Sequence, residues 1–158
     1  MIISNNNTNT IAGSDCVVSN KLTLTSISGL NASSYHFKVG GDVEFTDASY
    51  NKTTATQKII LNGTGTQNLT GAGICGLNLE VNKSAGIAQM GANLTLSNAN
   101  SDVIITAGEL YLNGYNLTVD RNLTVNGKLS LKGNETITVS TIVAPATNAA
   151  FAINSGST

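Results

Sequence analysis

The chain has 158 residues, of which 11% are charged and 41% hydrophobic, and its formal net charge is -1. This length suits one domain with its own core; the low charge argues against a basic surface for nucleic acid, and the apolar content argues against a disordered chain. Asn (21), Thr (20), Gly (16) and Ser (15) are abundant, with one Pro and no Trp, which favours short strands joined by turns over long helices.

The two ends of the chain differ from its middle. Residues 1–10 have neither the basic start nor the apolar core of a signal peptide, and no stretch approaches the roughly 18 apolar residues that span a bilayer. We therefore expect no membrane span. If the protein is exported, we expect that its leader has been removed or that this chain is a segment of a longer product. We treat 1–158 as a single domain in which 1–13 and 144–158 serve as terminal caps or contact another subunit.

Two cysteines, Cys16 and Cys75, lack C-x-x-C spacing and accompanying histidines. Zinc binding and thioredoxin-type chemistry therefore have no support. A disulfide between the two is open, but burial as small apolar residues is the favoured interpretation.

The segment GDVEFTD contains the densest group of carboxylates: Asp42, Glu44 and Asp47. Alternation predicts Asp42 and Glu44 on one face of a strand, with Val43 and Phe45 on the other. A solvated outer face explains them better than a catalytic groove, because no Arg or His lies nearby in sequence to complete a site. His36 likewise has no recognisable partner.

From the middle of the chain onward, apolar residues alternate with small polar residues in short runs separated by Gly or Asn. The apolar pairs are Leu77/Leu79, Leu94/Leu96, Leu110/Leu112, Leu117/Val119, Leu123/Val125, Leu129/Leu131 and Ile137/Val139. Alternation predicts that the side chains of the first six pairs, from Leu77/Leu79 to Leu129/Leu131, point into a core. Asn113-Gly114, Asn126-Gly127 and Gly133-Asn134 are the expected corners.

The spacing of these runs predicts a stacked fold. Steps of six or seven residues are too short for a crossover helix, and three steps span 19 residues from Leu110 to Leu129 and 20 from Leu117 to Ile137. We expect an all-β, parallel, right-handed β-helix of about seven or eight rungs, roughly 35 to 40 Å tall. An antiparallel hairpin array stays open as an alternative, since Asn-Gly also favours hairpins.

Four segments carry a family resemblance: GTGTQNLTG (63–71), LNLEVNKSAG (77–86), NLTL (93–96) and ITAGELYLNGYNLTV (105–119). They resemble the β-strand repeats of long bacterial surface and adhesin-like proteins, which are similar to filamentous haemagglutinins. The resemblance covers just under half of the chain. It implies a β-solenoid in an extracellular setting that serves as a stalk, fibre or adhesive surface without catalysis in the repeat.

The remaining candidate chemistry is sparse. Arg121 follows Asp120 and is interpreted as its surface ion-pair partner, and neither calcium nonapeptides nor phosphate-binding loops occur. We therefore predict no catalytic residue, no metal ligand and no cofactor. Glycosylation is permitted by ten Asn-x-Ser/Thr sequons: Asn6, Asn31, Asn51, Asn62, Asn68, Asn82, Asn93, Asn116, Asn122 and Asn134.

These observations favour a non-catalytic extracellular structural protein, a subunit or segment of a surface fibre, filament or adhesin stalk. The alternative is a carbohydrate-binding or carbohydrate-cleaving β-helix, for which 4% aromatic residues are poor equipment. The expected partner is a second copy of the chain, stacked head-to-tail on unpaired terminal rungs, with surface glycans as a further partner and nucleic acid excluded.

Overall fold

A computed structural model describes residues 1–5, 9–10, 13–27, 30–31, 35–46, 56–71, 76–96, 100–143 and 150–153. These residues contain strands and no helix. The strands are β1 (Ile2–Asn5), β2 (Asn9–Thr10), β3 (Cys16–Val18), β4 (Leu22–Ile27), β5 (Leu30–Asn31), β6 (Phe37–Val39), β7 (Val43–Thr46), β8 (Lys58–Leu61), β9 (Gln67–Thr70), β10 (Asn78–Met90), β11 (Leu94–Leu96), β12 (Val103–Tyr111), β13 (Leu117–Val125), β14 (Lys128–Leu131), β15 (Ile137–Val143) and β16 (Ala150–Ile153).

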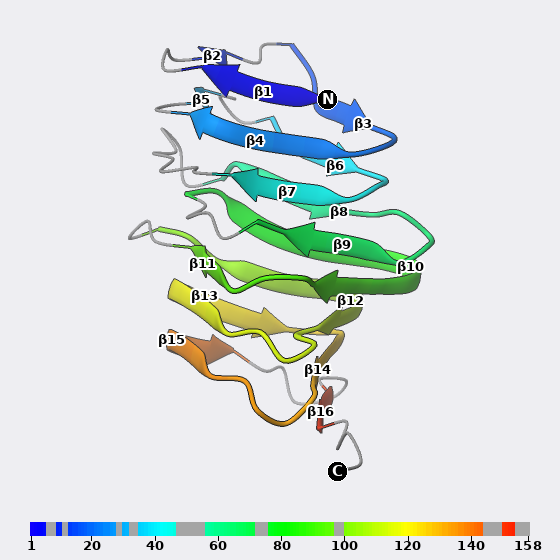
Figure 1. The fold of residues 1–158 in the computed structure, drawn as a ribbon, viewed down its shortest axis with the longest axis vertical. Coiled ribbons are helices and arrows are strands. Elements are labelled where there is room, and N and C mark those ends of the chain that lie inside the picture. Colours follow the sequence, from blue (N-terminus) through cyan, green and yellow to red (C-terminus); the bar gives the residue numbers. More distant parts are fainter. Residues whose placement is uncertain are drawn as a thin grey trace.

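The strands form an all-β parallel β-solenoid, as the sequence predicts (Figure 1). Every described strand pairing is parallel, so the hairpin alternative is wrong. Each turn of the chain advances along the axis of the column by about one strand spacing. The predicted repeat is confirmed residue for residue in the C-terminal half, where Leu110 pairs with Leu129 and Leu117 with Ile137.

Each turn passes through three sides, which we number in chain order. Side 1 holds β1, β4, β7, β9, the end of β10, the end of β12, β14 and β16. Side 2 holds β2, β5, β11 and the starts of β13 and β15. Side 3 holds β3, β6, β8, the starts of β10 and β12, and the ends of β13 and β15.

The number of turns depends on what is counted. Side 1 has eight strand levels, within the predicted seven or eight, and seven spacings of about 4.8 Å make this ladder about 34 Å tall. About five turns carry strands on all three sides in the described part of the chain. The turns around β7 and β9 lack a described strand on side 2, because 47–55 and 72–75 lie outside the described residues.

Several strands are longer than the predicted runs of three to five residues. β10 runs for 13 residues over two sides, and its pairing register shifts between Val81 and Ile87, where the chain turns the corner. β13 likewise joins two predicted runs, with a shift between Val119 and Asn122. The corners therefore interrupt the pairing register of both strands, and in β10 Gly86 also has a left-handed φ of 70°.

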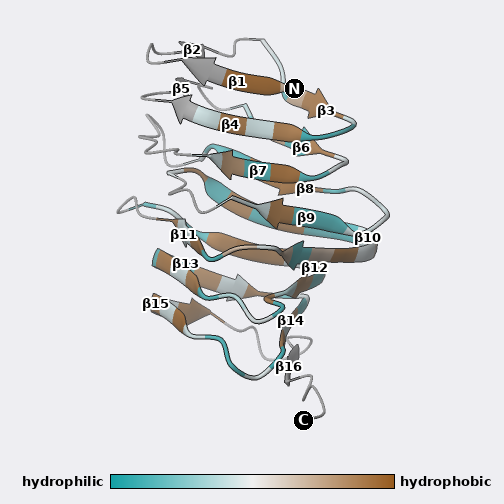
Figure 2. Ribbon diagram, in the orientation of Figure 1, coloured by the Kyte–Doolittle hydropathy of each residue, from teal (hydrophilic) through white to brown (hydrophobic). Residues whose placement is uncertain are grey.

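The core is the interior of the column. Hydrophobic segments recur on every level of the ribbon (Figure 2), and the inward side chains stack from turn to turn. Eleven of the predicted inward residues are buried, whereas Leu131 is only partly buried. The buried ones are Leu77, Leu79, Leu94, Leu96, Leu110, Leu112, Leu117, Val119, Leu123, Val125 and Leu129.

Candidate functional site

The predicted acidic group divides between two structural tasks. Val43 and Phe45 are fully buried and Asp42 and Glu44 are half-buried on the outer face, as the alternation predicts. Asp42 Oδ1 accepts a hydrogen bond of 2.7 Å from the backbone N–H of Asn68. Glu44 forms an ion pair of 2.8 Å with Lys21, which lowers the pKa of its carboxyl. Asp47 lies outside the described residues.

Asp42 belongs to a set of six side-chain oxygens that bond to the next turn. Each belongs to an Asn or Asp at the start of a strand, and each accepts the backbone N–H of a residue one turn further on. The pairs are Asp15–His36, Asp42–Asn68, Asn78–Asp102, Asp102–Asn122, Asn93–Asn116 and Asn116–Thr136, at 2.7 to 3.2 Å. These bonds satisfy donors at the corners, where strand pairing is interrupted.

All five ion pairs between described residues also join neighbouring turns. They are Lys21–Glu44, Lys38–Asp15, Lys58–Glu80, Lys128–Glu109 and Arg121–Asp102. Lys58–Glu80 is the least exposed of the lysine pairs, at 2.7 Å, and Glu80 also accepts a 2.9 Å bond from the Thr106 hydroxyl. Each of these carboxylates therefore links one turn to the next.

The predicted partner of Arg121 is wrong. Arg121 makes a two-pronged contact with Asp102, in which Nε donates to Oδ1 at 2.7 Å and Nη2 donates to Oδ2. Burial raises the pKa of the Asp102 carboxyl, but the bonds from Arg121 and Asn122 outweigh burial and hold that pKa below its usual value. Asp120 is exposed and lies in the register shift of β13, at the corner between sides 2 and 3.

A buried lysine was not expected from the sequence. Lys83 is 2% exposed at the corner within β10, where its Nζ donates to Gln67 Oε1 at 2.7 Å and to the Gly63 carbonyl. Gln67 in turn donates to the Val39 carbonyl at 2.9 Å. Burial lowers the pKa of the Lys83 amine. The local sequence around Lys83 gives no sign of this burial, which depends on the register between turns.

The corner at residues 132–134 is organised by Glu135. Its carboxylate accepts backbone N–H bonds from Lys132 (2.6 Å), Gly133 (2.8 Å) and Asn134 (3.0 Å), and from Gly114 (2.7 Å) in the turn before. Partial burial raises the pKa of this carboxyl, but the backbone donors outweigh it and lower the pKa to about 2.

The other sequence candidates form no assembled site among the described residues. Cys16 is a free cysteine whose Sγ lies 3.6 Å from Met1 Sδ, and Cys75 lies outside the described part of the chain. The buried His36 Nδ1 has no hydrogen-bond partner among the described residues. Across those residues, no group of three or more His, Cys, Asp or Glu side chains is arranged to hold a metal ion.

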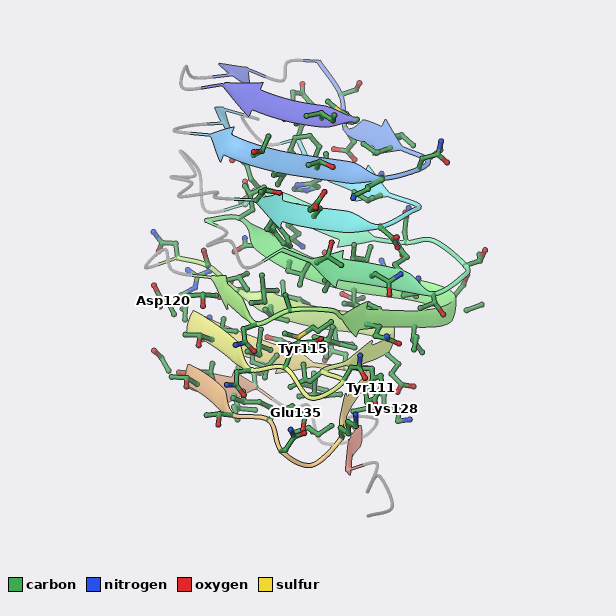
Figure 3. All side chains as sticks on the ribbon, in the orientation of Figure 1. Tyr111, Tyr115, Asp120, Lys128 and Glu135 are labelled. Carbon is green, nitrogen blue, oxygen red and sulfur yellow. The ribbon has the colours of Figure 1, made fainter. Side chains whose placement is uncertain are left out.

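Two of the described tyrosines lie in the C-terminal half of the column. Tyr111 and Tyr115 are both half-buried, and Tyr115 packs partly against the core. Tyr111 lies near Lys128 in Figure 3, while Asp120 projects from the opposite side of that view. Among the sequon asparagines with described side chains, Asn62, Asn82, Asn93, Asn116 and Asn134 are exposed, and Asn68 and Asn122 are half-buried.

The C-terminal end of the described column leaves interior rows uncovered. Ile137, Val139 and Ile142 pair with Leu117, Val119 and Leu123, which are buried one turn earlier. Ile137 and Val139 are only partly buried, and Ile142 is 52% exposed. At the N-terminal end, Ile3 and Val18 are buried, but Met1 and the outward Ile2 are exposed.

No protein-family model, curated protein or solved structure matches this chain. The described residues contain no helix that is long and apolar enough to cross a membrane.

Proposed function

We propose that this chain is a non-catalytic extracellular structural protein, a β-solenoid subunit or segment of a surface fibre, filament or adhesin stalk. The observation that carries the proposal is the use of the charged side chains: all five described ion pairs link one turn to the next. Repetition of such links along a column favours a rigid spacer, since each turn is held by its neighbours.

Two further features support this role. The Asn and Asp side chains at strand starts bond to the following turn on all three sides, so the polar residues that dominate the composition also stabilise the stack. The segments at 63–71, 77–86, 93–96 and 105–119 resemble repeats of bacterial adhesin-like proteins, which supports an extracellular setting.

The proposal is tested by the location of the protein in the cells that produce it and by the effect of deleting its gene. An antibody against the folded chain is used for surface labelling and cell fractionation, and the gene is then deleted. We expect label on the surface of intact cells and loss or shortening of a surface structure in electron micrographs after deletion. Label confined to the cell interior contradicts the proposal.

A second assay addresses the carbohydrate alternative. Purified protein is incubated with a panel of acidic and neutral polysaccharides, and both binding and release of reducing or unsaturated ends are measured. We expect no turnover. Cleavage that is lost in Asp42→Asn or Glu44→Gln, with the fold retained, would replace the structural proposal by an enzymatic one.

A further inference from the structure

We infer that a second copy of this chain docks on the C-terminal end of the column, rotated about the axis by one of its three sides. This inference rests on the proposed function and names the partner and the register of the contact. It follows from the order in which the strands occupy the three sides.

The two described ends of the solenoid are steps, not flat faces. The first turn places β1 on side 1, β2 on side 2 and β3 on side 3. The last described strands are the start of β15 on side 2, the end of β15 on side 3 and β16 on side 1. Side 1 is therefore one strand level ahead of the other two sides at the C-terminal end (Figure 1).

Stacking with the same sides aligned does not fit this step. If β1 of the next copy paired with β16, then β2 and β3 of that copy would each stand two levels from β15. Two of the three sides would lose a strand level, and their backbone groups would be left without partners.

Rotation by one side removes the mismatch. β1 of the next copy then follows the start of β15 on side 2, its β2 follows the end of β15 on side 3, and its β3 follows β16 on side 1. Each joins at the next level, so parallel pairing continues on all three sides. Three successive copies complete one rotation, which makes the contact heterologous and the assembly an open filament.

The uncovered interior residues match this arrangement. Ile137, Val139 and Ile142 continue rows that are buried one turn earlier, and a further turn is what buried their predecessors Leu117, Val119 and Leu123. With Ile3 of the next copy placed on Val139, the exposed Ile2 falls beside Thr138 in the outward row that already contains Thr95 and Thr118.

The last turn also lacks the charges that guard an edge against pairing. Residues 136–143 contain no Asp, Glu, Lys or Arg, whereas natural edge strands are commonly protected by charged side chains. The outward neighbours Thr138 and Ser140 are small and uncharged, so they present no barrier to an approaching strand.

Paired cysteines test the register. In a Cys16→Ser, Cys75→Ser background, Ile2→Cys with Thr138→Cys places thiols on adjacent strands of neighbouring copies. We expect mild oxidation to give a ladder of disulfide-linked oligomers that collapses on reduction. The matched control is Ile2→Cys with Thr118→Cys, which lies in the same row one turn further inside. Equal ladders from both pairs, or a ladder from neither, would overturn the inferred register.

Sedimentation of the cysteine-substituted and unmodified 158-residue chains tests the association itself. We expect concentration-dependent oligomers that Ile142→Lys weakens about tenfold or more, because it places a charge in an apolar contact. Ala85→Lys, at an exposed mid-column corner, should leave association unchanged. A chain that stays monomeric at high concentration overturns the stacking contact, whereas failure of the proposed function appears separately, as absence from the cell surface.

Discussion

Glu135 illustrates how a single side chain can define a corner. Its carboxylate receives four backbone N–H bonds, three from its own corner and one from Gly114 in the preceding turn. These donors stabilise the ionised carboxylate more than the protonated carboxyl, which accounts for the lowered pKa of about 2. Corner and neighbouring turn are therefore coupled through one ionisable group.

This coupling predicts a pH dependence of stability. The folded-state pKa of Glu135 lies below its ordinary value of 4.5, so its contribution is complete above about pH 4.5 and is lost as the pH falls towards 2. Glu135→Gln should lower the free energy of unfolding at pH 7 by about 1 kcal/mol, a value reduced by solvent screening. Thermal unfolding of the parent protein and of Glu135→Gln from pH 7 to pH 2 measures the difference in stability between them. A difference in stability that does not become smaller below pH 4.5 contradicts the role given to the Glu135 carboxylate.

At the scale of the element, the corner between sides 3 and 1 brings backbones of successive turns together. Gly108 has φ of +79°, and a Cβ there would lie 2.8 Å from Lys83 Cβ and 2.9 Å from the Lys83 carbonyl oxygen. Gly65, at the same corner two turns earlier, has nothing within 4 Å of an added Cβ and no left-handed φ. The backbone conformation and the close contacts therefore require glycine at position 108 but not at position 65.

We predict that Gly108→Ala destabilises the protein by about 1 to 3 kcal/mol, because it adds both a backbone penalty and a close contact. Gly65→Ala should be neutral or stabilising by up to about 1 kcal/mol through the unfolded state. Chemical denaturation of the two variants beside the parent protein provides the comparison. Equal losses from both would show that the Gly108 corner relaxes more freely than its contacts indicate.

The contact between Arg121 and Asp102, which immediately precedes β12, gives a second prediction at this scale. Asp102→Asn should destabilise the protein by about 1 to 3 kcal/mol, because it removes a charged acceptor from a partly buried guanidinium. Asp120→Asn should change stability by less than about 0.5 kcal/mol, as expected of an exposed position. A double-mutant cycle with Arg121→Met isolates each coupling energy, and coupling to Asp120 in place of Asp102 would refute the partner that we describe.

At the scale of the whole molecule, the buried hydrophobic side chains form one continuous core in which each turn packs on its neighbours. Leu123 lies between Val103 and Ile142 on side 3 and is fully buried. A break at one level therefore affects the turns on both sides of it. In stacked folds, stability is close to a sum of turn and interface contributions.

Leu123→Asp should cost several kcal/mol, because it places an unpaired carboxylate in a narrow apolar interior. Thr124→Asp, the adjacent outward position, is the matched control and should have a small effect. Hydrogen exchange read out by mass spectrometry should show lost protection centred on β12, β13 and β15, with β4, β7 and β9 less affected. Retained protection around residue 123 would contradict the inward placement.

The sequence by itself determined the fold class, most of the core and the corners. Alternation places Leu117 and Val119 inward whatever the neighbours are, because successive side chains of a strand point to opposite faces. The repeat of 19 or 20 residues from Leu110 and Leu117 can likewise be read from the sequence, since short strands of similar sequence recur every six to eight residues. Asn113, at φ of 53°, and Gly114, at +89°, adopt the left-handed backbone that the corner predicts.

Only the tertiary structure decided which polar groups meet. The partner of a side chain lies one turn away, and the length of a turn varies from 19 residues at Leu110–Leu129 to 26 at Val43–Leu69. Proximity in sequence therefore predicts Asp120 as the partner of Arg121, whereas the register between turns brings Asp102 to it. The burial of Lys83 has the same cause, because its acceptors Gly63 and Gln67 belong to the preceding turn and become adjacent only when the turns stack.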